Sequence, residues 1–219
     1  MRLPPLQAIL DFEVALGARR SLPELARAYL DGGARFLQLR AKHLPSGPLL
    51  ALADTIVRLA APYGAIVLVN DRPDVARLSG AAGVHVGQDD VPPAAARIVL
   101  GPDAIVGVST HTVAEVDAAL REPVDYVAVG PIFGTRTKDT GYDAVGLGLV
   151  REAAARARQA ASAGQNPLPI VAIGGITLDT APAVLEAGAA SVAVISDLLA
   201  NGDPATRVRR YIETLPGGA

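Results

Sequence analysis

The most constraining feature of this sequence is an alternation of short apolar runs with alanine-rich, helix-forming segments, repeated eight times along 219 residues. Several runs are apolar on both faces, as in parallel strands that helices cover on each side. The alternation predicts an α/β protein with one domain over residues 1–219, folded as a single (β/α)8 TIM barrel. The expected strands are Ala8–Leu10, Ala34–Leu39, Ile66–Val69, Gly83–Val86, Ile105–Val108, Tyr126–Val129, Ile170–Ile173 and Val192–Ile195.

A doubly wound open sheet is the competing fold for such a pattern. Open sheets of that kind usually carry a glycine-rich dinucleotide-binding turn directly after the first strand. The corresponding segment here reads LDFEVALG and has no such turn, which favours the barrel.

Capping signals mark two of the expected helices. Ser21 is followed three residues later by Glu24, a capping box, and that helix is expected to end at Gly32-Gly33. Thr112 and Glu115 repeat the same spacing before a later helix.

Composition limits the classes of function. The net charge is −2 with no basic block, and aromatic residues make up 4% of the chain, so a nucleic-acid partner is not expected. Small anionic substrates need only a local basic site and remain compatible. The sequence contains no cysteine, which excludes disulfides, thiolate metal ligands and a cysteine nucleophile.

The sequence gives no sign of secretion or of membrane insertion. Its start, MRLPPLQAILDFEV, lacks a long apolar core before a small-residue cleavage site. No apolar run approaches the roughly 20 residues that span a bilayer. A cytoplasmic location without a membrane partner is therefore expected, and a homo-oligomer is left open.

In a barrel of this kind the active site lies at the carboxyl ends of the strands, so polar residues there are candidates. The second strand ends FLQLRAK, where Gln38, Arg40 and Lys42 recur at period two. Side chains alternate along a strand, so these three project together, toward the mouth if the leucines meet the helices. They would bind an anion there; the alternative is that Arg40 and Lys42 are solvated loop residues.

Acidic residues follow the next two expected strands. Asn70 and Asp71 come directly after one, and Asp89 and Asp90 come just after the other. The carboxylates of Asp71 and Asp90 leave neighbouring strands at similar height, and such a pair suits a hard cation such as Mg²⁺. Alternatively, each aspartate caps the helix that a following proline begins.

The fifth strand ends GVSTHT, in which Ser109 is expected to point inward. Thr112 is expected as a helix cap, and His111 is either structural or part of the site. His85 lies inside a strand and is expected to be a core histidine with satisfied hydrogen bonds.

Three further segments complete the candidates. The seventh strand is followed by Gly174-Gly175 and the eighth ends near Ile195-Ser196, the places where barrels often bind phosphate. The sixth strand runs into VGPIFGTRTKDTG, which crowds two hydroxyls and two cations together. That cluster comprises Thr135, Arg136, Thr137 and Lys138.

Seven motifs occur in the same order and at similar spacings as in the thiamine-phosphate synthase family, which this chain resembles. The motifs are FLQLRAK, LVNDRPDVA, GVHVGQDD, VGVSTHT, VGPIFGTRTK, VAIGGIT and VAVIS. The resemblance runs from about Ala34 to Ser196. It implies a TIM-barrel transferase that joins 4-amino-2-methyl-5-hydroxymethylpyrimidine diphosphate to hydroxyethylthiazole phosphate. The products are thiamine phosphate and pyrophosphate, formed by a Mg²⁺-assisted dissociative mechanism.

The resemblance also implies a role for each motif residue. Arg40, Lys42, Ser109 and Lys138 would act in catalysis, and Asp71 and Asp90 would bind the Mg²⁺ cofactor. The opening strand, AILDFEVA, matches the family poorly and receives no site residue, and Gly134 stands where the family usually has proline. The implied substrate-binding residues are Gln38, Leu39, Arg40, Ala41, Lys42, Asn70, Ser109, Thr135, Arg136, Thr137, Lys138, Gly175, Ile195 and Ser196.

Two other functions are compatible with parts of this pattern. A thiazole tautomerase of the same superfamily would bind thiazole phosphate without joining it to anything. A non-catalytic thiamine-phosphate sensor would need the phosphate pocket but not the metal. Neither would need both aspartates together with a complete Thr-x-Thr-Lys segment, and this sequence has both features.

Overall fold

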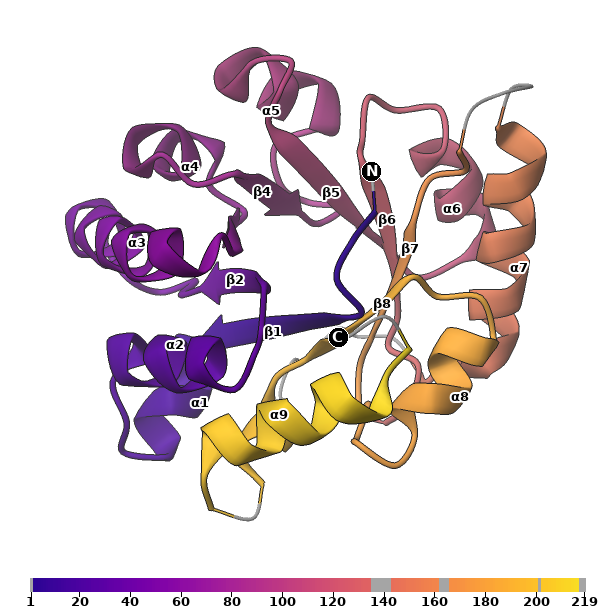
Figure 1. The fold of residues 1–219 in the computed structure, drawn as a ribbon. Coiled ribbons are helices and arrows are strands. Elements are labelled where there is room, and N and C mark those ends of the chain that lie inside the picture. Colours follow the sequence, from indigo (N-terminus) through magenta and orange to yellow (C-terminus); the bar gives the residue numbers. More distant parts are fainter. Residues whose placement is uncertain (1, 135–142, 162–165, 201, 217–219) are drawn as a thin grey trace.

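The protein is described by a computed structural model that covers residues 2–134, 143–161, 166–200 and 202–216. Eight parallel strands pair in chain order, and the last pairs with the first to close the barrel (Figure 1). The TIM barrel is confirmed, and the doubly wound sheet is excluded. The strands are β1 Leu6–Asp11, β2 Phe36–Arg40, β3 Ile66–Asn70, β4 Gly83–Val86, β5 Ile105–Thr110, β6 Tyr126–Val129, β7 Ile170–Ile173 and β8 Ser191–Val194.

Helices surround the barrel and cover the outer face of the sheet (Figure 1). The capping box expected at Ser21 is present: the Ser21 hydroxyl accepts from Glu24 N, and Glu24 accepts from Ser21 N. The helices are α1 Phe12–Gly17, α2 Leu22–Asp31, α3 Ser46–Ala60, α4 Pro73–Ser79, α5 Pro93–Leu100, α6 Val113–Ala119, α7 Gly146–Ala160, α8 Ala181–Glu186 and α9 Pro204–Thr214, with 3-10 helices η1 Ala61–Tyr63 and η2 Ser196–Leu199.

Side chains alternate between two cores. Leu37 and Leu39 of β2 belong to the larger core between sheet and helices, whereas Phe36 of the same strand belongs to a smaller core inside the barrel. This is the period-two alternation expected of a strand. The same alternation places Gln38 and Arg40 on the inner face, above Phe36.

A tyrosine fills much of the barrel interior. The Tyr126 ring packs edge-on against Phe36, with ring centroids 6.1 Å apart, and stacks on the His85 ring at 5.5 Å. The opposite position on β5 is Gly107, where a Cβ would lie only 2.0 Å from the Tyr126 ring. The glycine is therefore required by the close approach of the tyrosine.

Four strands extend further toward their carboxyl ends than the apolar runs predicted. β1, β2, β3 and β5 continue to Asp11, Arg40, Asn70 and Thr110. Their polar end residues thus hold strand geometry, which fixes the direction of their side chains at the mouth. No helix among the described residues is both long and apolar enough to cross a membrane.

Candidate active site

An arginine at the end of β2 is held by an aspartate at the end of β1. Arg40 and Asp11 are directly paired in the strand register, and Arg40 Nη1 donates to Asp11 Oδ2. Both side chains are largely buried, with 14% and 1% of their surface exposed. Among the described residues, the buried Arg40 Nε has no hydrogen-bond partner, so this guanidinium is oriented but not saturated.

Lys42, Asp71 and Asp90 form a second charged group on the same side of the mouth. Lys42 Nζ lies 3.1 Å from Asp71 Oδ2. Burial, and then a side-chain hydrogen bond with Asp90, raise the pKa of Asp71, while the contact with Lys42 lowers it. The two carboxylates therefore converge, as their positions after neighbouring strands predicted.

Neither aspartate serves as a helix cap. The N-cap residues of α4 and α5 are Arg72 and Pro92, and neither helix has a side-chain cap. Asp90 Oδ2 instead accepts from Gly87 N at 2.8 Å, within its own loop. Asp71 adopts a left-handed backbone with φ of 63°, a conformation that costs energy for a residue other than glycine.

The donor set at this place fits a hard divalent cation. Two carboxylates in contact repel each other, and a cation between them would relieve the repulsion that now raises the pKa of Asp71. Among the described residues, no group of three His, Cys, Asp or Glu side chains could hold a metal. A pair of carboxylates suits Mg²⁺, which usually keeps several waters and binds substrate phosphate.

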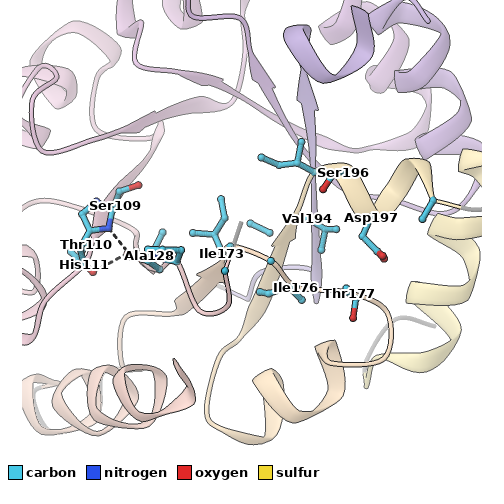
Figure 2. Close-up of a pocket in the computed structure, with 18 residues that line it drawn as sticks. Ser109, Thr110, His111, Ala128, Ile173, Ile176, Thr177, Val194, Ser196 and Asp197 are labelled. Atoms are coloured by element: carbon cyan, nitrogen blue, oxygen red, sulfur yellow. Dashed lines mark hydrogen bonds between the residues drawn. The ribbon is translucent and has the colours of Figure 1, made fainter. Parts of the chain in front are cut away.

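The other side of the mouth is a pocket of about 560 Å³ at the ends of β5 to β8 (Figure 2). Its lining includes Ser109, His111, Gly175, Ile195 and Ser196, and most of its other side chains are small or apolar. Figure 2 shows Ser109 and His111 at one end of this pocket and Ser196 at the other.

Ser109 is fixed by a buried chain of polar groups. His85 Nε2 lies 2.8 Å from Ser109 Oγ, and His85 Nδ1 lies 2.7 Å from Tyr126 Oη. His85 is thus the satisfied core histidine that the sequence indicated. Burial raises the pKa of Tyr126, so its hydroxyl stays protonated at neutral pH. Ser109 points inward as expected.

His111 holds the strand ends together at the pocket. Its Nδ1 lies 2.7 Å from Gly130 O, and its backbone N–H donates to Glu115 Oε2 at 2.7 Å. Thr112 caps α6 as predicted by accepting from Glu115 N. The Glu115 carboxylate thus accepts from His111, the residue before the cap, whereas its backbone N–H donates to the cap residue Thr112.

Two glycines bring the loop after β6 against the loop after β7. A Cβ on Gly174 would lie 2.5 Å from Pro131 Cα, and one on Gly175 would lie 2.6 Å from Gly134 O. Their φ angles of 105° and 63° also favour glycine. Gly134, which directly precedes the Thr-Arg-Thr-Lys segment, is therefore packed against the loop after β7.

The residues Thr135, Arg136, Thr137 and Lys138 lie outside the described part of the chain. The described residues that precede this segment are hydrogen-bonded to those that follow it. Val145 N donates to Pro131 O at 2.8 Å, and Gly146 N donates to Ile132 O at 3.0 Å.

A sequence profile described as thiamine monophosphate synthase matches residues 7–198. The chain belongs to the thiamine monophosphate synthase family. A thiamine-phosphate synthase of Anaeromyxobacter dehalogenans is 46% identical over 193 residues, covering 88% of this chain and 82% of that protein. One from Koribacter versatilis is 41% identical and covers 98% of this chain and 97% of its own length.

A solved structure supports the same relationship. The thiamine phosphate pyrophosphorylase from Pyrococcus furiosus superposes with a TM-score of 0.82 at 29% identity, covering 95% of this chain and 94% of that one. The family resemblance seen in the seven motifs is therefore confirmed.

The structure places the family motif residues in two groups. Gln38, Arg40, Lys42, Asn70 and the aspartate pair lie at the ends of β2 to β4, and Ser109, Gly175, Ile195 and Ser196 line the pocket. The side chains of Leu39 and Ala41 lie in the outer core, so only their main chain is free to face a ligand.

Asp11 is the residue that the sequence reasoning missed. The opening strand resembles the family poorly, so the motifs do not indicate this residue. The criterion applied to the other strands, a polar residue where an apolar run ends, would have selected it, since Asp11 ends AILD.

Proposed function

We propose that this protein is a thiamine-phosphate synthase, a transferase that joins 4-amino-2-methyl-5-hydroxymethylpyrimidine diphosphate to hydroxyethylthiazole phosphate and releases pyrophosphate. Membership of the thiamine monophosphate synthase family supports this activity. The observation that carries the proposal is that the mouth of the barrel contains two different sites side by side. A cationic group with two converging carboxylates lies beside a glycine-lined pocket.

The diphosphate is assigned to the β2 to β4 side. Arg40 and Lys42 supply positive charge, and Asp71 and Asp90 are the residues that would hold Mg²⁺. When bound, Mg²⁺ would neutralise charge on the diphosphate oxygens. Arg40, oriented by Asp11, is assigned a contact with a phosphate oxygen, which is a contact that an arginine fork makes well. Gln38 and Asn70 complete this group, and Ser109, which lines the neighbouring pocket, is assigned to the same diphosphate.

The thiazole phosphate is assigned to the pocket at the ends of β7 and β8. Gly175, Ile195 and Ser196 line it, and backbone N–H groups near glycine can approach an anion closely. Thr135, Arg136 and Thr137 are assigned to the same phosphate and Lys138 to the diphosphate. Gly134, the described residue before this segment, packs on Gly175 of the pocket.

A dissociative reaction suits these residues. Pyrophosphate leaves first, and the thiazole nitrogen captures the resulting pyrimidine-methyl cation. No protein nucleophile is needed. Cations fixed before the reaction stabilise the charge that grows on the leaving group. The Asp11 carboxylate contributes by holding Arg40 in place, which avoids reorganisation as the bond breaks.

The decisive experiment is incubation of the purified protein with both substrates and Mg²⁺. Thiamine phosphate and pyrophosphate should appear in equal amounts, and neither should form when one substrate or the metal is omitted. A thiazole tautomerase would release no pyrophosphate, and a thiamine-phosphate sensor would bind without turnover. Either result would contradict the proposed function.

Three further proposals concern context. Residues 1–219 are proposed to act as one domain, because β8 pairs with β1 and closes one barrel. The site is proposed to be complete within one chain, although a homo-oligomer is compatible with it. The reaction is proposed to occur in the cytoplasm, where its phosphorylated substrates would be retained.

A further inference from the structure

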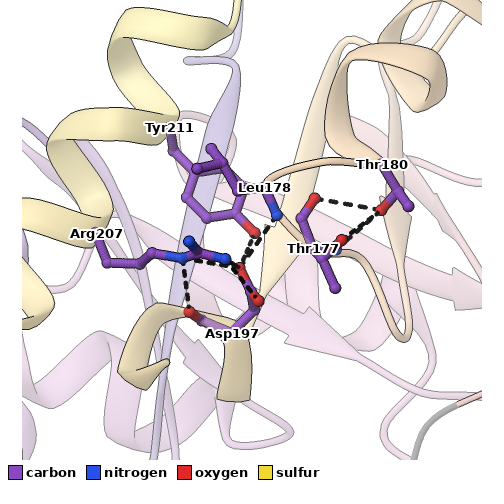
Figure 3. A network of polar contacts seen from close by, with 6 residues as sticks. All are labelled: Thr177, Leu178, Thr180, Asp197, Arg207 and Tyr211. Carbon is purple, nitrogen blue, oxygen red and sulfur yellow. Dashed lines mark hydrogen bonds and ion pairs between the residues drawn. The ribbon is translucent and has the colours of Figure 1, made fainter. Parts of the chain in front are cut away.

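One aspartate outside the family motifs joins three segments beside the phosphate pocket. Asp197 lies in η2, directly after Ser196. Its Oδ2 accepts from Leu178 N at 3.1 Å and from the Tyr211 hydroxyl at 2.5 Å (Figure 3). Arg207 Nη2 donates to both carboxylate oxygens, at 2.9 and 2.7 Å. We call Asp197, Leu178 N–H, Arg207 and Tyr211 the Asp197 clamp.

The clamp is mostly withdrawn from solvent. The side chains of Arg207 and Asp197 are 11% and 14% exposed. Burial and the hydrogen bond to Asp197 raise the pKa of Tyr211, so its hydroxyl remains a donor. A buried ion pair that keeps its charges needs such additional hydrogen bonds.

The sign of the charge excludes Asp197 as a phosphate ligand. Asp197 is part of the pocket lining, and an unpaired carboxylate there would repel a phosphorylated substrate. Arg207 neutralises that charge from behind, and Arg207 itself is not part of the lining. The aspartate therefore acts on the pocket through the segments that it joins.

Two of the three joined segments, the one after β7 and the one after β8, carry the proposed phosphate site. The paired register of β7 and β8 ends with Ile173 opposite Ala193, before either Gly175 or Ser196 is reached. Beyond that point, the hydrogen bond from Leu178 N to the Asp197 carboxylate connects the segment after β7 to the segment after β8. Thr177 N donates to Thr180 Oγ1 at 2.9 Å, which fixes the shape of the first segment before it meets the clamp.

We propose that the Asp197 clamp sets the spacing between the Gly175 and Ser196 segments, and thereby the affinity for the phosphate-bearing substrate. Asp197, Arg207 and Tyr211 are positioning residues, and two of them stand on α9, outside the barrel. The proposal rests on the proposed function for the identity of that substrate.

The test uses Arg207→Gln and Tyr211→Phe in the full chain, with steady-state kinetics at varied concentrations of each substrate. The Michaelis constant for thiazole phosphate should rise about tenfold in Arg207→Gln, which is equivalent to about 1.4 kcal/mol, and should rise less in Tyr211→Phe. The Michaelis constant for the pyrimidine diphosphate and kcat at saturation should change less than about twofold. Arg207→Lys, which keeps the charge, should recover part of the loss.

A matched control removes an ion pair of similar kind elsewhere. Arg156 of α7 donates to both oxygens of Asp117 on α6, and neither residue lines the pocket. Arg156→Gln should leave both Michaelis constants unchanged. If Arg207→Gln behaves like this control, or raises both Michaelis constants equally, the clamp has no selective role and the proposal is wrong.

Calorimetric titration with thiazole phosphate separates this proposal from the proposed function. A parent protein that binds thiazole phosphate but makes no thiamine phosphate would overturn the function alone. Weaker binding in Arg207→Gln would still support the clamp, and equal binding in the two proteins would overturn it. Circular dichroism melting curves of each variant identify the temperature at which all of them are folded for this titration.

Discussion

Asp71 combines a strained backbone with an unfavourable charge. Its φ is 63°, and burial together with Asp90 raises its pKa. Asparagine tolerates left-handed geometry and removes the charge. Strain and repulsion held at one residue are typical of a functional site, where a ligand supplies the compensation.

Asp71→Asn should therefore stabilise the metal-free protein while abolishing most turnover. Because the pKa of Asp71 is higher in the folded protein than in the unfolded chain, the folded parent is destabilised as the pH rises through that pKa and Asp71 becomes charged. The melting temperature of Asp71→Asn should match the parent near pH 3.8, the ordinary pKa, and exceed it at higher pH. The gain should stay below about 1 kcal/mol because the site is partly solvated. Activity should fall by more than the 10–100-fold typical of losing an outer-shell partner of a metal.

Thermal melts of both proteins from pH 3.5 to 8 without divalent metal test the stability effect. Kinetics with Mg²⁺ test the activity. An equally active Asp71→Asn would remove Asp71 from the metal site.

Asp11 and Arg40 should behave as one unit. Arg40→Lys should lose about 1–3 kcal/mol in kcat/KM, because an ammonium does not reproduce a charge-assisted fork contact. Asp11→Asn should lose a comparable amount, since it releases the guanidinium that Asp11 holds. The double variant should lose little more than either single variant.

A double-mutant cycle on kcat/KM, with the pyrimidine diphosphate varied, measures this coupling. Additive losses would show that Asp11 acts independently of Arg40.

At the scale of elements, the loops after β6 and β7 form one packed unit. Phe133 N donates to Gly174 O at 2.9 Å, and Ile132 N donates to Ile173 O at 2.9 Å. Gly174 and Gly175 permit this contact because any larger residue would collide with the facing loop. The Thr-Arg-Thr-Lys segment therefore begins at a fixed point of the mouth.

Substitutions of the two threonines and of Lys138 in this segment should change different kinetic constants. A Thr135→Val/Thr137→Val variant should mainly raise the Michaelis constant for thiazole phosphate, because it loses two hydroxyl donors. Lys138→Ala should mainly lower kcat, since charge on the leaving pyrophosphate grows toward the transition state. Steady-state kinetics with each substrate varied in turn make the comparison. A Lys138→Ala variant with unchanged kcat and weaker thiazole phosphate binding would contradict this assignment.

At the scale of the whole molecule, ligand binding at the mouth should stabilise the closed barrel. The mouth is built from the ends of all the strands, and β8 closes on β1, so its geometry exists only in the folded state. A ligand that binds only that state adds about 2.7 kcal/mol at 100 times its dissociation constant.

Pyrophosphate should therefore raise the melting temperature of the parent more with Mg²⁺ than without it. In Asp71→Asn the metal-dependent part should disappear. Differential scanning calorimetry with pyrophosphate alone, Mg²⁺ alone and both together tests this. An equal metal-dependent increase in the variant would show that Asp71 does not bind the metal.

The sequence by itself determined the fold and most strand positions. β4, β6 and β7 occupy the residues predicted, because runs of apolar residues on both faces require burial in a covered parallel sheet. It also determined which side chains share a face of β2, since alternation along a strand is a local property. The seven motifs, in order along the chain, were likewise sufficient to indicate the family.

Only the tertiary structure decided which polar groups meet. Asp11 and Arg40 are 29 residues apart in sequence, and the parallel register of β1 with β2 places them opposite each other. The aspartates after β3 and β4 were equally compatible with helix caps until their loops placed them together. Asp197 meets Arg207 and Tyr211 only because α9 packs on the barrel beside η2. Such contacts depend on register, twist and closure, which are properties of the assembled sheet and not of any local pattern.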